Sequence, residues 1–158
     1  MPIPYLDLSH QYKKIQAVIE PKILAILASG QYILGSEVTE CESALAAFTG
    51  SKHALAVSNG TVALQMALQA IDVKPGDEVI VPSFSFFATA EVVSTLGATP
   101  VFVDVETDSY NIDVSKIERA ITPKTRAIMP VSLYGQISDM DEIMAIAQKH
   151  KLTVVEDA

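Results

Sequence analysis

From residue 53 onward, short apolar runs alternate with segments of helical periodicity, and this alternation constrains the fold more than any other feature of the sequence. The runs are almost continuously apolar, which is typical of strands buried on both faces of a sheet. The helical segments between them are long enough to connect parallel strands. The predicted strands are Ala54–Val57, Glu78–Val81, Val101–Val103, Arg126–Val131 and Leu152–Val155. The sequence therefore predicts an α/β fold of three layers, in which helices cover both faces of a mainly parallel sheet.

Two amphipathic helices are predicted before the alternating region, over residues 9–29 and 36–48. Ser9 is a suitable cap for the first helix, and Gly30 is a suitable stop. Pro21 lies inside the first helix, so we expect a kink or a division into two shorter helices there.

A small polar turn follows the first predicted strand and opens a helix rich in Ala and Leu. Ser58 and Asn59 are good helix-capping residues, and Gly60 lets a backbone approach a ligand closely. A helix that begins here directs unpaired N–H groups and its positive dipole end at one point, which phosphate often occupies. The turn by itself fits a simple helix cap slightly better than it fits a ligand site.

Composition argues against several classes of function. The formal charge of −8 disfavours nucleic acid or an anionic membrane as the main partner. Cys41 is the only cysteine, which indicates a reducing compartment such as the cytoplasm, and it lies in the apolar stripe of the second helix, where packing is its expected role. The three histidines are scattered without metal-ligand spacing, so no metal site is expected.

Ligands of parallel sheets gather beyond the carboxyl ends of the strands. The predicted strand ends carry a phosphate-type turn, an aromatic pair and a carboxylate, in the segments Ser58–Thr61, Pro82–Phe87, Asp104, Ser132–Gln136 and Glu156–Asp157. Phe86 or Phe87 can stack on a flat ring, while the other belongs to the core. Asp157 favours the protonated form of a ring nitrogen by charge attraction. This set suits pyridoxal phosphate, whose electron-sink property depends on that protonation.

These motifs resemble those of the DegT-type aminotransferases, which act on nucleotide-linked keto sugars and have the type I fold of pyridoxal phosphate enzymes. The resemblance covers nearly the whole chain, and its specificity comes from the order and spacing of the motifs. The motifs are Ile3–Leu8, Gly35–Val38, Ser58–Leu64, Val81–Ala90, Phe102–Val105, Pro130–Gln136 and Val155–Ala158.

The resemblance implies a role for four residues. Gly60 and Thr61 match the phosphate-binding turn, Phe86 matches the position that stacks on the pyridine ring, and Asp157 matches the carboxylate that pairs with the pyridine nitrogen. The family more often has His at the position of Ser132, so this chain departs from the pattern there.

The resemblance further implies that a nucleotide-linked keto sugar and an amino acid donor, glutamate in the usual case, are the substrates, in polysaccharide or amino-sugar biosynthesis. It implies a homodimer for the complete protein. The catalytic Schiff-base lysine of the family is expected beyond Ala158, because none of Lys52, Lys74, Lys124, Lys149 and Lys151 has the required context. Residues 1–158 are accordingly expected to form the N-terminal part of the large domain, preceded by helices over about 9–48 and lacking the small C-terminal domain, with apolar surface exposed.

Two alternatives remain open from the sequence. The chain is either part of an active enzyme or a non-catalytic remnant that binds a ligand or a partner. Within the fold, related sugar dehydratases use the same cofactor with His in place of the lysine, and the sequence does not separate them from aminotransferases.

Overall fold

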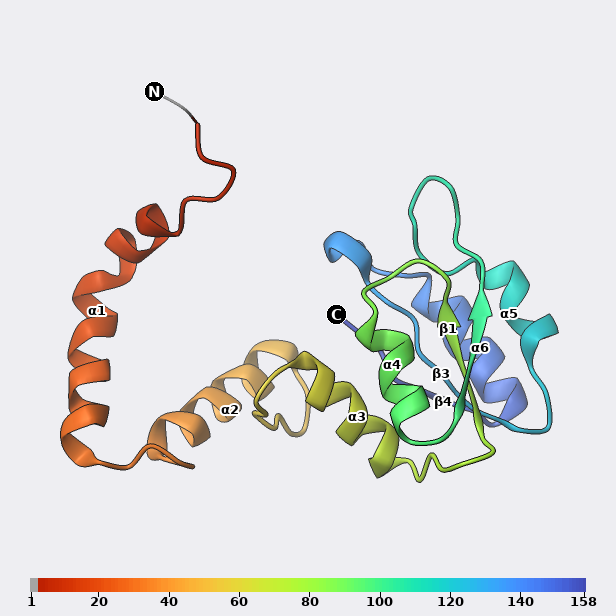
Figure 1. The fold of residues 1–158 in the computed structure, drawn as a ribbon, viewed down its shortest axis with the longest axis horizontal. Helices are drawn as coiled ribbons and strands as arrows, with labels where there is room; N and C mark the ends of the chain where they lie inside the picture. The colour runs from red at the N-terminus through yellow and green to blue at the C-terminus, as the bar shows by residue number, and fades with distance from the viewer. Residues whose placement is uncertain (1–2) are drawn as a thin grey trace. The chain divides into compact units, whose positions relative to one another are not determined.

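The computed structural model describes residues 3–158, which form two compact units that divide between Ala56 and Val57 (Figure 1). The first unit contains helices α1 (Leu8–Ser29) and α2 (Ser36–Thr49), close to the predicted bounds. No described helix of the chain is both long enough and apolar enough to cross a membrane.

The ends of α1 show how local chemistry sets a helix. Its cap is Asp7, whose carboxylate accepts from the backbone N–H of His10, so the predicted cap at Ser9 is wrong. Gly30 ends the helix in the left-handed conformation, as predicted. The helix continues through Pro21 without division. Because the helix is exposed, water can solvate the carbonyl group that Pro21 leaves without a partner.

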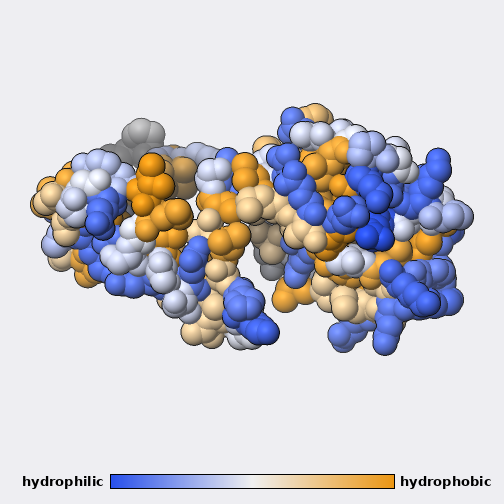
Figure 2. Space-filling model, turned by 90° about the horizontal axis from the view of Figure 1, so that it is seen from below, coloured by the Kyte–Doolittle hydropathy of each residue, from blue (hydrophilic) through white to orange (hydrophobic). Residues whose placement is uncertain are grey.

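Neither α1 nor α2 buries a single residue. Large apolar side chains of this unit are exposed, among them Leu8, Ile15, Val18, Ile23, Leu24, Leu27, Ile33, Leu34, Leu45 and Phe48. Hydrophobic residues are visible at the surface in Figure 2. The expectation of exposed apolar surface is therefore confirmed.

The second unit is built on a sheet of four parallel strands in the order β2-β1-β3-β4. The strands are β1 (Glu78–Pro82), β2 (Thr99–Val103), β3 (Thr125–Ile128) and β4 (Thr153–Val154). The helices are α3 (Gly60–Ala70), α4 (Ala88–Thr95), α5 (Val114–Ala120) and α6 (Met140–His150), with a short 3-10 turn at Leu133–Gly135. The four strands agree in type and approximate position with the strands predicted from residue 78 onward, and α3 begins at the polar turn from which a helix was predicted.

Alternate residues of β1 face two separate cores. Val79 and Val81 pack with α3 and α4, while Ile80 packs with α5 and α6. The three-layer arrangement predicted from the apolar runs is therefore confirmed: helices cover both faces of the sheet.

The predicted strand Ala54–Val57 is wrong, because these residues form no strand in the structure. The backbone N–H of Ala56 donates to the carboxylate of Glu42, at 2.9 Å, in place of a neighbouring strand. A strand needs a partner with which to exchange backbone hydrogen bonds, and the described residues offer none at this segment.

The central position of β1 leads to a stability prediction. Ile80 is fully buried, whereas Ile137 is 72% exposed. We expect Ile80→Val to lower the free energy of unfolding by about 0.5–1.5 kcal/mol, because a buried methylene is lost, and Ile137→Val to change it little. Urea unfolding of both variants measures the difference, and equal effects would contradict a core centred on β1.

Candidate cofactor-binding site

The connections that leave the two central strands, β1 and β3, run in opposite directions across the sheet. The crossover through α4 leads to β2 on one side of β1, and the crossover through α5 returns to β3 on the other side. The two helices consequently cover opposite faces of the sheet, as right-handed crossovers require. Such a reversal leaves a crevice beyond the carboxyl ends of the two strands, here β1 and β3, where ligands of parallel sheets bind.

Asp157 is held beside this crevice by its backbone. It forms an isolated parallel bridge with Val131, just beyond the end of β3. Its N–H donates to the carbonyl of Pro130, and its carbonyl accepts from the N–H of Ser132, both at 2.9 Å. The carboxyl group therefore projects from a backbone whose position β3 determines.

The side chain of Asp157 is bound to the first turn of α4. The Thr89 hydroxyl donates to its Oδ2 at 2.7 Å, and the Ser85 hydroxyl lies 3.1 Å from that of Thr89. Thr89 is only 2% exposed. Neither Thr89 nor Ser85 was predicted from the sequence to be a site residue. One sequence feature could have indicated Thr89: it is a polar residue at helical spacing from Val92 and Val93, and all three are buried.

The charge of Asp157 is not neutralised by the described part of the chain. No Lys, Arg or His of residues 3–158 forms an ion pair with it. Its Oδ1 atom has no hydrogen-bond partner there, and since no buried polar side-chain atom of these residues is unpaired, Oδ1 is accessible. A half-buried carboxylate with an open oxygen suits a cationic ligand group such as a protonated ring nitrogen.

Phe86 and Phe87 lie in the segment between β1 and α4. They are 76% and 72% exposed, so the expectation that one of them belongs to the core is wrong. The carbonyl of Phe86 accepts from the N–H of Thr89, at 3.2 Å, which fixes Phe86 one turn ahead of the residue that binds Asp157. Its exposed ring face is free to stack on a flat ligand.

The start of α3 offers backbone donors. Asn59 caps the helix by accepting from the N–H of Val62 at 2.9 Å, as the sequence predicts. The described residues provide no acceptor for the N–H groups of Gly60 and Thr61. A Cβ atom at Gly60 would meet nothing within 4 Å. These are the properties of an anion-binding helix start.

The four predicted site residues fall into two groups in the structure. Phe86 and Asp157 are both linked to Thr89, whereas no hydrogen bond joins Gly60 or Thr61 to either of them in the described part of the chain. The connection is through packing, because α3 packs against α4 on the same face of the sheet. A ligand with a phosphate at one end and a ring at the other would bridge the two groups.

The lysines of the second unit named in the sequence analysis lie away from this edge. Lys74 and Lys124 precede β1 and β3, and Lys149 and Lys151 precede β4, so all four lie at the amino ends of the strands. Five residues of β1 separate the two edges by about 15 Å.

The turn after β3 is held by Asn111, which was not predicted from the sequence to have a role. Buried Asn111 donates to the carbonyl of Gln136 at 3.1 Å and accepts from the N–H of Leu133 at 3.4 Å. Between these contacts Tyr134 adopts a positive φ of 56°, an uncommon conformation for a residue other than Gly. Ser132 donates to the carboxylate of Glu156.

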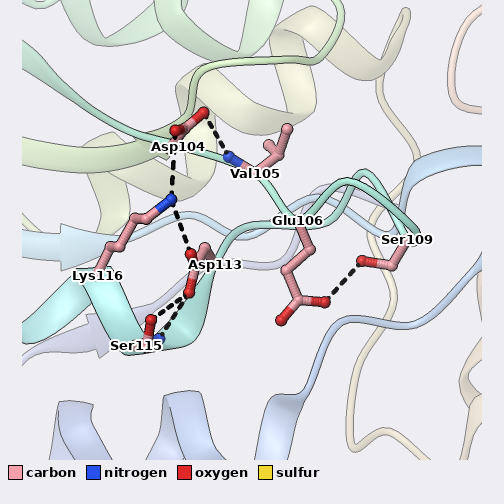
Figure 3. A network of polar contacts seen from close by, with 7 residues as sticks. All are labelled: Asp104, Val105, Glu106, Ser109, Asp113, Ser115 and Lys116. Carbon is pink, nitrogen blue, oxygen red and sulfur yellow. Dashed lines mark hydrogen bonds and ion pairs between the residues drawn. The ribbon is translucent and has the colours of Figure 1, made fainter.

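A network of charged residues braces the loop after β2 (Figure 3). Lys116 lies 3.3 Å from the carboxylate of Asp104 and 2.9 Å from that of Asp113. The Lys116 hydrogen bond is the main cause that lowers the pKa of Asp104, and the Ser115 hydroxyl and then Lys116 lower the pKa of Asp113. The two carboxylates raise the pKa of Lys116. The network is structural: Asp104 accepts from the Val105 N–H and pairs with Lys116, so it holds the loop.

This architecture places the protein in a general class, the parallel α/β proteins that bind a ligand at a topological switch point. Within that class, residues 13–158 match the sequence model of the DegT/DnrJ/EryC1/StrS aminotransferase family, and the chain belongs to that family. The resemblance drawn from the motifs is thereby confirmed.

Individual relatives agree with this assignment. The chain is 52% identical over 156 residues to UDP-2-acetamido-2-deoxy-3-oxo-D-glucuronate aminotransferase of Pseudomonas aeruginosa, covering 99% of this chain and 44% of that protein. The crystal structure of S. venezuelae DesV matches with a TM-score of 0.96 at 44% identity, over 99% of this chain and 42% of that one. Bacillus subtilis NtdA, solved with bound cofactor PMP, matches with a TM-score of 0.92 at 37% identity, over 99% and 36%. The chain thus spans less than half the length of these relatives.

The brace around Lys116 predicts a pH-dependent effect on stability. Lowered carboxyl pKa values stabilise the fold above the unfolded-state value of about 3.9, and this contribution is lost as pH falls through the lower folded values. The raised pKa of Lys116 adds stability that is lost as pH rises through its folded value. We expect Lys116→Met to lower the melting temperature most between about pH 5 and 9 and progressively less outside that range. Lys74→Met, which removes an exposed pair with Asp72, is the control. A Lys116→Met effect independent of pH would contradict the brace.

The open space at Gly60 predicts a separation of binding from folding. Gly60→Ala introduces no clash, so we expect the free energy of unfolding to stay unchanged or to rise by less than about 1 kcal/mol. We expect pyridoxal phosphate to bind about tenfold more weakly, as about 1.4 kcal/mol of binding is lost when the added methyl group enters the space open to phosphate. Fluorescence titration measures this, with Ser36→Ala at the start of α2 as the matched control. Unaltered affinity would remove Gly60 from the site.

Proposed function

We propose that the complete protein containing this chain is a pyridoxal phosphate-dependent aminotransferase that aminates a nucleotide-linked keto sugar. The single observation that carries the proposal is the half-buried Asp157 carboxylate, which has an open oxygen at the β1/β3 crevice and no cationic partner in the described residues. Membership in the aminotransferase family supports the same reaction class.

The bound cofactor supplies an electron sink for cleavage and formation of bonds at the amino-bearing carbon. Asp157 keeps a proton on the ring nitrogen through its negative charge. Phe86 fixes the plane of the ring by stacking. The N–H groups of Gly60 and Thr61, with the Thr61 hydroxyl, bind the phosphate at the start of α3.

The substrate class rests on the relatives. The Pseudomonas aeruginosa protein is named for a UDP-linked 3-keto sugar acid, and another relative, 48% identical and found in Acidithiobacillus ferrooxidans, is named for a UDP-linked 3-keto glucosamine derivative. By extension we propose a nucleotide-linked keto sugar as acceptor and glutamate as donor, for polysaccharide or amino-sugar biosynthesis. We further propose a homodimer located in the cytoplasm; the single cysteine supports the reducing compartment.

Isotope transfer tests this function. The complete protein, loaded with pyridoxal phosphate and given ¹⁵N-glutamate and a UDP-linked 3-keto sugar, should yield a ¹⁵N-labelled amino sugar by mass spectrometry. We expect Asp157→Asn to lower kcat by about two to three orders of magnitude, because it removes the charge that stabilises the ring proton.

Glu156→Gln is the matched control, since within residues 3–158 the Glu156 carboxylate has a hydrogen bond only from Ser132, and Glu156 is exposed. A folded, cofactor-loaded protein that transfers no ¹⁵N to any keto sugar would refute the proposal. A deoxygenated product in place of an amino sugar would favour the dehydratase alternative.

A further inference from the structure

Two hydroxyl groups connect α4 to the carboxylate at the crevice. Ser85 lies in the segment after β1, Thr89 lies in the first turn of α4, and Asp157 follows β4, 68 residues after Thr89 in the chain. The oxygen distances are 3.1 Å from Ser85 to Thr89 and 2.7 Å from Thr89 to Asp157 Oδ2. Thr89 is nearly inaccessible to solvent, so water competes little for these bonds.

Counting protons fixes the direction of this chain of hydrogen bonds. An ionised carboxylate only accepts, and a hydroxyl has a single proton to donate. Thr89 gives its proton to Asp157, so the contact between Ser85 and Thr89 requires Ser85 to be the donor. A hydroxyl that itself accepts a hydrogen bond is a stronger donor, and Ser85 therefore strengthens the bond from Thr89 to Asp157.

We infer that Ser85 and Thr89 are positioning residues for the cofactor ring. Thr89 occupies Oδ2 and prevents rotation of the carboxylate, so that Oδ1 remains the oxygen presented to the ring nitrogen. This inference rests on the proposed function, because it assigns Oδ1 to a protonated ring nitrogen. It adds to that function that the selectivity for a nitrogen-containing ring depends on two neutral hydroxyls, which need not touch the ligand.

A purely structural tie between α4 and the segment after β4 is the competing explanation for the same contacts. The two explanations differ in which ligand they affect. A structural tie affects every ligand of the crevice equally, whereas positioning of Oδ1 affects only a ligand whose ring carries the nitrogen.

The test measures dissociation constants of two probes in the complete protein by calorimetry. The probes are pyridoxamine phosphate, which does not react with lysine, and its analogue with the ring nitrogen replaced by CH. We expect the unmodified protein to prefer the nitrogen-containing probe. Thr89→Val, which keeps the side-chain shape, should weaken pyridoxamine phosphate about tenfold, or about 1.4 kcal/mol, and leave the analogue unaffected. Thr89→Ser, which keeps the hydroxyl, should retain the preference.

Ser85→Ala provides a second variant that does not alter a helix or a buried residue. It should weaken pyridoxamine phosphate by a smaller factor, about threefold, again without effect on the analogue. Equal weakening of both probes by Thr89→Val and Ser85→Ala would overturn the inference and leave the proposed function intact. Equal binding of both probes by the unmodified protein would overturn the pairing of Asp157 with the ring nitrogen, and the proposed function with it.

Discussion

The backbone pairing of β1 with β2 on one side and β3 on the other is the constraint on which the rest of the second unit depends. Both faces of β1 are buried, so helices must cover both. With right-handed crossovers, that is achieved only if the chain reverses direction across β1. The crevice between the ends of β1 and β3 is thus a consequence of how the apolar strand is buried. Its position does not depend on which polar residues line it.

Asp157 uses this crevice because its backbone is paired to the extension of β3 while its side chain is bound from α4. The carboxylate is therefore held between two layers of the fold. Burying such a charge costs free energy unless it is paired, and the Thr89 hydroxyl compensates one oxygen only. The other oxygen gives the site its preference for a cationic partner, and the proposed cofactor site is therefore centred on Asp157.

The local sequence pattern was sufficient to predict an element where the element depends on its own residues and their near neighbours. The apolar run at β1, the Asn59 cap of α3 and the Gly30 stop of α1 each depend on neighbours within a few positions, and each is found as predicted. The local pattern gave a wrong prediction where the structure depends on a partner that is distant in the chain. Ala54–Val57 are apolar residues typical of a strand, but no strand of residues 3–158 pairs with them, and Phe87 is an apolar residue typical of a core but is exposed.

The sequence by itself determined the fold class and the family, because apolar periodicity and motif order are properties of the linear chain; the four cofactor contacts are an expectation that follows from the family. Only the tertiary structure decided the strand order, the switch point and the link from Ser85 through Thr89 to Asp157. Thr89 and Asp157 are 68 residues apart, and no local rule relates them. Their contact follows from α4 packing on one face of the sheet whose β3 extension holds Asp157, an arrangement that exists only after folding.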